Sequence, residues 1–162
     1  MEKKPKKLQH IIIGEKAKEK LNYRISAKVI QGKGIEGDRY FYGQGTFNKP
    51  QLSQDVREIS IISSKSLELC NQRLNSKLNF LDLRRNLVIE NLNEELEINT
   101  IFSIGTAQFK IVRTCPPCRY LSRLLDEDIM KGLKYIGGLR ASIIKSGTIN
   151  INDEIIINHD GK

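Results

Sequence analysis

The sequence contains no tryptophan, only two histidines and an odd number of cysteines, three. An odd count argues against a disulfide framework and favours a reducing compartment. No run of about 18 apolar residues is present, which excludes an ordinary transmembrane helix. The N-terminal stretch is basic, but its apolar run is too short for a signal peptide. These absences together predict a cytoplasmic protein that does not enter a membrane.

The charge is unbalanced, with 27 basic against 19 acidic residues and a formal net charge of +8. Such an excess suits either nucleic acid or an anionic small molecule. Aromatic residues make up 6% of the chain and are not interleaved with basic residues, as they are in base-stacking surfaces. We therefore expect a small anionic molecule and no nucleic acid as the partner.

Short apolar stretches between turn signals predict a protein built mainly from β-strands. A chain of 162 residues is long enough to form one domain with its own core. We expect a closed or partly closed β-barrel with a few helices on its rim. The expected strands are 11–13, 24–30, 58–62, 87–90, 107–111, 141–144 and 154–157, the last two forming a hairpin.

Two segments have the periodicity of helices. Ser63 or Ser64 can cap the first, whose apolar positions begin at Leu67. Cys70 lies on the same apolar face, so we expect it to be a buried helix cysteine. The second helix is expected over residues 117–133.

Residues 31–54 show no clear periodicity, although they contain five glycines and four aromatics. A loop of this length in a compact domain is usually functional or disordered, and the aromatics argue against simple disorder. Within it, G-K-G-I-E-G-D-R-Y places Asp38 and Arg39 directly after a glycine-rich turn. The glycine spacing is not a dinucleotide-binding fingerprint because no helical pattern follows.

The stretch R-T-C-P-P-C-R-Y-L contains a C-x-x-C pair, Cys115 and Cys118. Structural zinc needs more ligands than this pair and two terminal histidines provide, and a redox dithiol usually lies in a βαβ context. A third interpretation is that Pro117 opens a helix and places Cys118 in its first turn, where a thiolate is favoured. Cys118 could then bind a soft metal or carry sulfur, with Cys115 tuning it. The structural alternative is a pair of packed cysteines at a strand end.

Two further basic motifs can contact an anion. L-R-R-N-L-V-I places Arg84, Arg85 and Asn86 at the start of an apolar strand, and G-G-L-R delivers Arg140 to another strand start. Arginine pairs with phosphate in a bidentate way, and Asn86 can hydrogen-bond an adjacent group. The structural alternative for these residues is a solvated strand start.

Taken in order, G-I-E-G-D-R-Y, R-R-N-L-V-I-E-N-L, R-T-C-P-P-C-R-Y-L and G-G-L-R-A-S-I-I-K-S-G resemble a stand-alone MOSC domain, the C-terminal domain of molybdenum cofactor sulfurases. The resemblance covers about residues 25–158. It implies a mostly β, barrel-like fold that binds the molybdenum cofactor, a pterin dithiolene carrying a phosphate. The implied site residues are Cys118 as catalytic residue and molybdenum ligand, with cofactor contacts from Arg84, Asn86, Asp38, Arg39 and Arg140.

The sequence departs from the family pattern at two of these motifs. Tyr40 stands where the family often has histidine, which removes the expected proton donor, although a phenol can still hydrogen-bond. Arg85 replaces the proline of the family's R-P-N motif. The sequence also contains no pyridoxal-phosphate desulfurase domain, so any sulfur must come from another protein.

The resemblance implies a molybdenum-cofactor-dependent oxidoreductase. Its expected reaction is the two-electron reduction of N-hydroxylated or N-oxide small molecules, with electrons from a separate reductase. The alternative is a carrier in which Cys118 holds persulfide sulfur, or hands on cofactor, without turnover of its own. We expect a basic N-terminal segment with the first strand over residues 1–20, the MOSC-like domain over 21–158 and a tail over 159–162.

Overall fold

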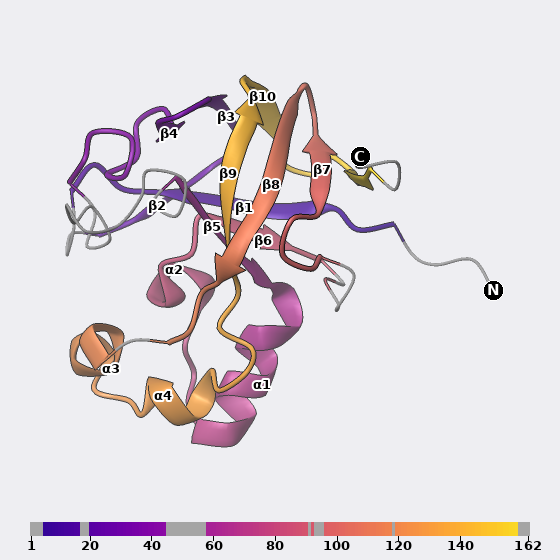
Figure 1. Cartoon of the computed structure of the whole chain (residues 1–162). Helices are drawn as coiled ribbons and strands as arrows, with labels where there is room; N and C mark the ends of the chain where they lie inside the picture. The colour runs from indigo at the N-terminus through magenta and orange to yellow at the C-terminus, as the bar shows by residue number, and fades with distance from the viewer. Residues whose placement is uncertain are drawn as a thin grey trace.

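The computed structural model describes residues 5–16, 20–44, 58–90, 92, 96–117 and 119–158. Figure 1 shows two sheets with a helical layer gathered below the larger one. The strands are β1 (Leu8–Ile13), β2 (Asn22–Arg24), β3 (Ser26–Ile30), β4 (Gly34–Ile35), β5 (Ile59–Ser63), β6 (Leu87–Ile89), β7 (Ile101–Ile104), β8 (Ala107–Thr114), β9 (Leu139–Lys145), β10 (Gly147–Asn150) and β11 (Ile155–Ile157). The helices are α1 (Ser64–Leu74), α2 (Phe80–Leu83), α3 (Arg119–Leu125) and α4 (Ile129–Gly132).

The larger sheet has the order β11-β7-β8-β9-β5-β6-β1-β2, and the smaller has the order β10-β3-β4. Neighbouring strands are antiparallel except for the parallel pair β5 and β6. A parallel pair needs a crossover connection, and α1 and α2 provide it. The prediction of a mainly β fold with a few helices is therefore confirmed.

A closed barrel is not confirmed, because the described strands form no continuous ring of ladders. One isolated bridge, between Lys7 and Glu154, joins the residue before β1 to the residue before β11. Backbone hydrogen bonds from Leu8 N to Asp153 O and from Ile155 N to Lys6 O accompany it, at 2.8 Å and 2.7 Å. The larger sheet is therefore curved enough to bring its edge strand β11 beside the start of β1, although its other edge strand is β2.

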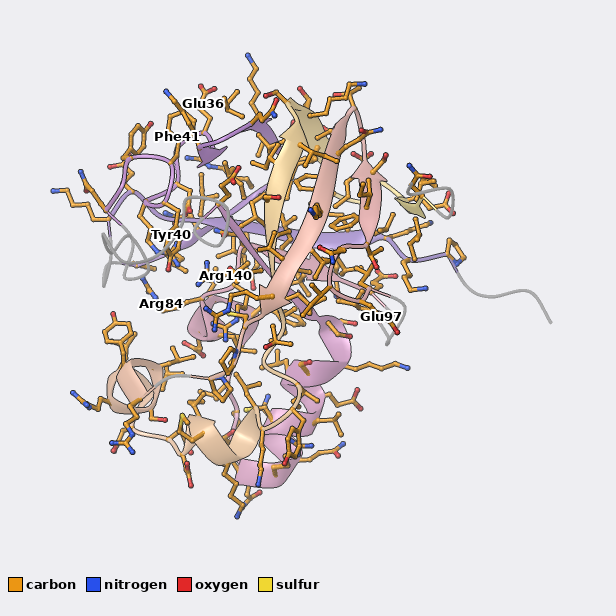
Figure 2. All side chains as sticks on the ribbon, viewed as in Figure 1. Glu36, Tyr40, Phe41, Arg84, Glu97 and Arg140 are labelled. Carbon is orange, nitrogen blue, oxygen red and sulfur yellow. The ribbon has the colours of Figure 1, made fainter. Side chains whose placement is uncertain are left out.

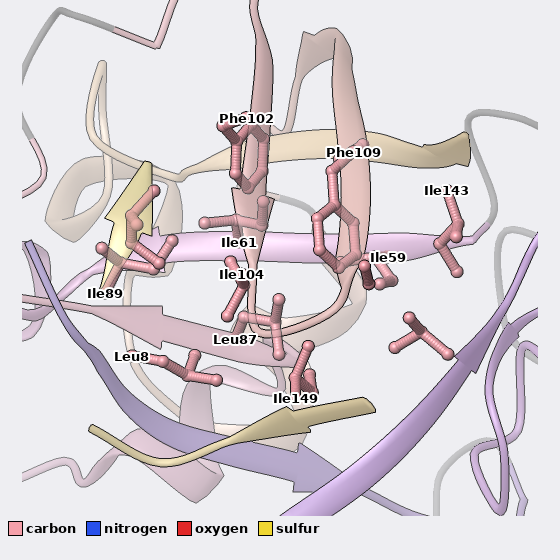
Figure 3. Close-up of a cluster of buried hydrophobic side chains, with 14 of the residues drawn as sticks. Leu8, Ile59, Ile61, Leu87, Ile89, Phe102, Ile104, Phe109, Ile143 and Ile149 are labelled. Atoms are coloured by element: carbon pink, nitrogen blue, oxygen red, sulfur yellow. The ribbon is translucent and has the colours of Figure 1, made fainter. Parts of the chain in front are cut away.

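The central strands β1, β5 and β6 bury both of their faces. Ile61 and Leu87 point into a core between the two sheets, whereas Ile62 and Val88 point into a second core beneath the helices. Figure 3 shows the first core, in which Phe102 and Phe109 stack with ring centroids 5.2 Å apart. Burial on both faces explains why these strands are continuous apolar runs in the sequence.

The helix prediction is confirmed for α1, where the Ser63 side chain accepts a hydrogen bond from Lys65 N and Cys70 is buried. The predicted helix over 117–133 is wrong, because the chain forms the separate helices α3 and α4 there. Asp126 between them has a left-handed backbone, with a φ of 51°, which a continuous helix does not allow. Asp128 then caps α4 by accepting a hydrogen bond from Lys131 N.

The predicted hairpin over 141–157 is also wrong. Gly147 begins a strand of its own, β10, which pairs with β3 in the smaller sheet, while β11 pairs with β7. The predicted strand 24–30 is divided into β2 and β3, which belong to different sheets. Within the described ranges, no helix has the length and apolar character needed to cross a membrane.

Candidate functional site

The candidate site lies where β8 ends and β9 begins, at the helical end of the larger sheet. Figure 2 shows Tyr40, Arg140 and Arg84 close together there, whereas Glu97 lies away from them. Asp38 and Arg39 come from the loop after β4, and Asn86 comes from the start of β6. The structure thus brings together five of the six residues predicted from the sequence.

Cys118, the sixth, lies outside the described residues. The predicted helix behind it is shorter than expected, because α3 begins at Arg119 and has seven residues. The helix-dipole argument for a Cys118 thiolate therefore loses much of its weight. Its role as catalytic residue and metal ligand stays a prediction.

Asp38 is completely buried and holds the loop in place with both carboxylate oxygens. Its Oδ1 accepts hydrogen bonds from Gly14 N at 3.1 Å and from Arg39 Nη1 at 2.9 Å. Its Oδ2 accepts from Tyr40 N at 3.4 Å and from Asn86 Nδ2 at 3.3 Å. Because all four of these donors belong to the protein, Asp38 acts as an internal anchor for the site.

Asn86 is the second anchor and is also completely buried. Its Nδ2 donates to Ile12 O at 3.1 Å as well as to Asp38, and its Oδ1 accepts from Ser60 N at 3.1 Å and from Ser60 Oγ at 3.2 Å. The amide therefore uses both hydrogens and accepts two hydrogen bonds within the protein. This geometry gives Asn86 a positioning role, because it joins β1, β5 and the Asp38 loop.

Four arginines surround these anchors. Arg39 Nη2 donates to Arg84 O at 3.4 Å, and Arg85 donates to Gly137 O at 3.0 Å and to Leu83 O at 3.3 Å. The alternative of a solvated strand start therefore does not hold for Arg85, which is 7% exposed. Arg140 is 3% exposed, so the cluster places several guanidinium groups in a largely buried volume.

The positive charges in this cluster repel one another. Burial, followed by the neighbouring Arg39 guanidinium, lowers the pKa of Arg84 below its ordinary value. Arg84 also has a left-handed backbone, with a φ of 59°, where it ends α2. A perturbed pKa and a left-handed backbone at one residue are both features that cluster at functional sites.

Tyr40 lies between two of these arginines. The Arg39 and Arg140 guanidinium carbons lie 4.8 Å and 5.1 Å from the centroid of its ring. The side chain is 3% exposed, and its phenol hydrogen-bonds with Arg140. Tyr40 therefore orders the cluster by stacking and hydrogen bonding, whatever its role in proton transfer.

Cys115 is the thiol that the structure describes beside the arginines. Burial opposes its ionisation, but Arg85, Arg140 and Arg113 outweigh burial, so the pKa of Cys115 is lowered. The C-x-x-C pattern was the sequence signal for a reactive thiol, and Cys115 is the cysteine of that pair that the structure describes. Among the described residues, no group of three or more histidine, cysteine or acidic side chains could hold a metal ion.

The glycine pair before Arg140 allows β9 to begin against Cys115. A Cβ on Gly137 would lie 2.5 Å from Cys115 O, and a Cβ on Gly138 would overlap Ile61 O. Gly138 also has a φ of +106°, a conformation that other residues rarely adopt. Its carbonyl accepts a hydrogen bond from Cys115 N at 2.8 Å.

A cavity of about 530 Å³ opens next to Cys115. Its volume falls within the usual range for small-molecule sites, about 300–1,000 Å³. Apolar side chains dominate its wall, and β5 and α1 each contribute one serine. The lining residues include Ser63, Ser66, Leu92, Leu96, Cys115 and Leu139.

The fold and site together define a mainly β protein with a largely buried arginine cluster and a neighbouring thiol, Cys115, which also lines a cavity. The sequence model of the MOSC domain family matches residues 48–156, about two-thirds of the chain. The chain belongs to the MOSC domain family, which is associated with binding of the molybdenum cofactor. A search of the curated proteins gave no match.

Solved structures share the fold at low sequence identity. The YuaD protein from Bacillus subtilis is 16% identical, with a TM-score of 0.80 over 95% of this chain and 96% of that one. YiiM from Geobacillus stearothermophilus is 15% identical, with a TM-score of 0.69 over 96% of this chain and 76% of the other. YiiM from Escherichia coli is 16% identical, with a TM-score of 0.69 over 95% and 68% of the two chains.

The residues of the site fit the charged part of the family's cofactor. Its phosphate is an anion, and Arg39, Arg84 and Arg140 provide cationic donors whose charges crowd one another. Guanidinium groups are the preferred partners of phosphate in proteins.

Proposed function

We propose that this protein binds the molybdenum cofactor at the arginine cluster and reduces N-hydroxylated or N-oxide small molecules there. The observation that carries the proposal is the crowding of Arg39, Arg84, Arg85 and Arg140 at one end of the sheet. A concentration of guanidinium groups is the arrangement that proteins use to bind phosphate and other oxyanions. The family membership supports the choice of cofactor.

In this proposal the protein's own residues bind and orient. Arg84 and Arg140 contact the phosphate and pterin, while Asp38 and Asn86 hold the loop that carries Arg39. Cys118 ligates molybdenum. When bound, the cofactor supplies two-electron transfer to the substrate, with electrons from a separate reductase.

The cavity beside Cys115 supports an enzyme over a sulfur or cofactor carrier. A carrier needs an accessible cysteine but no enclosed space for a second molecule. The volume of about 530 Å³ and the apolar wall are suited to a small-molecule substrate. If the test below finds no bound metal, the carrier becomes the favoured function.

The architecture is part of the same proposal. We propose that the contact between β1 and β11 makes the larger sheet a partly closed barrel, and that residues 21–158 form the MOSC-like domain. Strand β1 pairs with β6 and contributes to the core, so the first strand is integrated with that domain. Residues 159–162 lie outside the described part of the chain.

The test is metal and pterin analysis of protein expressed in a host that makes the cofactor. We expect molybdenum and pterin in the wild type and in the matched control Cys70→Ala, but no molybdenum in Cys118→Ala. Arg84→Met should bind the cofactor about tenfold more weakly or worse, because it loses a charged hydrogen bond worth about 1.5–3 kcal/mol.

Wild-type protein without molybdenum or pterin, from a host whose other molybdenum enzymes are active, would contradict the proposal. A persulfide on Cys118 in that same protein would favour the carrier. Loaded protein is then assayed for N-oxide reduction with an artificial electron donor, which separates cofactor binding from turnover.

A further inference from the structure

Cys115 lies where three positively charged side chains converge from three parts of the chain. Arg113 comes from β8, Arg85 from the segment before β6, and Arg140 from β9. Cys115 N donates to Gly138 O at 2.8 Å, and Arg140 lies two residues beyond that glycine, opposite Arg113 across β8 and β9. The thiol is 2% exposed, so water contributes little to screening these charges.

The groups near the arginine cluster that can carry a negative charge interact with different arginines. Asp38 pairs with Arg39 at 2.9 Å, and its remaining contacts are Gly14, Asn86 and the Tyr40 backbone. Burial opposes the charge of Arg140, but Cys115 and Tyr40 outweigh burial and raise its pKa. Cys115 and Tyr40 are therefore the groups that favour the charged form of Arg140 on the β9 side of the site.

The arginine partners are themselves fixed. Both hydrogen bonds of Arg85 go to backbone carbonyls, and the Arg140 guanidinium lies over the Tyr40 ring. The Cys115 backbone is held against Gly138. An ionised sulfur at this point would interact with two arginines held by different segments, Arg85 before β6 and Arg140 on β9.

We propose that Cys115 is a positioning residue, a built-in thiolate counter-ion that holds Arg140 and Arg85 in the orientation in which they receive the anionic ligand. The inference rests on the proposed function for the identity of that ligand, but the thiolate itself does not depend on it. Cys115 is distinct from Cys118, the predicted metal ligand. Its role is to orient cations, and it forms no bond to substrate.

The first test compares the free energy of unfolding of wild type, Cys115→Ser and Cys115→Asp as a function of pH, on metal-free full-length protein. Because the folded thiol ionises more readily than the unfolded one, its contribution is complete above about pH 8.5 and disappears as the pH falls through the folded pKa. The advantage of wild type over Cys115→Ser should therefore shrink on acidification. Cys115→Asp should retain a comparable advantage down to about pH 4.

Cys70→Ser is the matched control, because Cys70 is also buried but burial raises its pKa. The difference between wild type and this variant should not shrink over the same range. A wild-type advantage over Cys115→Ser that is independent of pH would overturn the proposal, because it would show a neutral packed thiol. If Cys115→Ser does not fold, ultraviolet absorbance follows the thiolate in wild type, and Arg140→Met should move its appearance to higher pH. An unchanged titration would equally overturn it.

The second test measures binding of inorganic phosphate by calorimetry at neutral pH. We expect about tenfold weaker binding in Cys115→Ser, with recovery in Cys115→Asp and no change in Cys70→Ser. Tighter binding in Cys115→Ser would overturn the positioning role, since it would mean that the sulfur only competes with the ligand. Absence of phosphate binding in the wild type would count against the proposed cofactor site, while the pH comparison still decides the state of Cys115.

Discussion

Cys70 and Cys115 are both buried, yet their surroundings shift the pKa values of the two thiols in opposite directions. Cys70 packs between α1 and α4 in an apolar layer, where burial raises its pKa despite the nearby Arg73. Cys115 is equally buried, but Arg85, Arg140 and Arg113 lower its pKa. The comparison shows that burial alone does not keep a thiol neutral, because several nearby cations can outweigh desolvation.

The surroundings of Cys70 and Cys115 also differ in how well they tolerate substitutions. The Cys70 region is held by side-chain packing, which can adjust by small rotations. The Cys115 region is held by backbone carbonyls and buried polar groups, which cannot adjust without losing hydrogen bonds. Four substitutions test this difference between the two regions.

The largest loss of stability is expected for Gly138→Ala next to Cys115. The new Cβ would overlap Ile61 O, and the positive φ is unfavourable for alanine. We expect a loss of more than about 3 kcal/mol in urea unfolding, or failure to fold, since steric and conformational costs add. Gly43→Ala is the control, because Gly43 has a φ of +73° but open space around it, and about 1 kcal/mol is expected. Equal losses in the two variants would show that backbone conformation alone matters.

Asn86→Ala should be the next most damaging change. It removes the hydrogen-bond partners of Ser60 N, Ile12 O and Asp38 in a fully buried place. Leaving such groups unsatisfied costs about 1–3 kcal/mol each in the worst case, so we expect a total loss of about 3 kcal/mol. Asn79→Ala provides the control, because it removes only an exposed capping box, at about 1 kcal/mol. A loss no larger than that of the control would refute the anchoring role of Asn86.

Gly132→Ala tests the packing beside Cys70. The new Cβ would lie 2.6 Å from Cys70 Sγ and 2.7 Å from Leu74 Cδ1, so α1 and α4 must separate slightly. Because both neighbours are side-chain atoms, we expect a loss of about 1–3 kcal/mol. The double variant Gly132→Ala with Cys70→Ala should recover part of that loss. Additive losses in thermal or urea unfolding would contradict direct contact as the cause.

The smallest effect on stability is expected for Arg84→Met. Removing this charge relieves repulsion with Arg39 and reduces the cost of burial, so the ligand-free protein should be as stable as wild type or more stable. Phosphate binding should nevertheless weaken, as expected for a residue retained for function at the expense of stability. Arg24→Met, at an exposed position on β2, is the control and should change neither property. A clear loss of stability in Arg84→Met would identify the arginine as structural.

Much of the site could be predicted because its residues follow recognisable turns and strand starts. Asp38 and Arg39 follow a glycine turn, Asn86 opens an apolar strand, and Arg140 follows the glycine pair. These motifs could not indicate which side chains make all of their hydrogen bonds to other groups of the protein. Ser60 was missed for this reason, although a serine within the buried run I-S-I-I was an available signal.

The amino-acid sequence by itself determined the mainly β class, the capped helix α1 with its buried Cys70, and the set of motifs that indicates the family. These features depend on local periodicity, capping and turn chemistry, which neighbouring residues express directly. Only the tertiary structure decided that β10 joins β3, that α3 and α4 are separate, and that Arg85 is buried beside Cys115. Each of these depends on pairing between distant segments, and the lowered pKa of Cys115 depends on the charges that such pairing brings together.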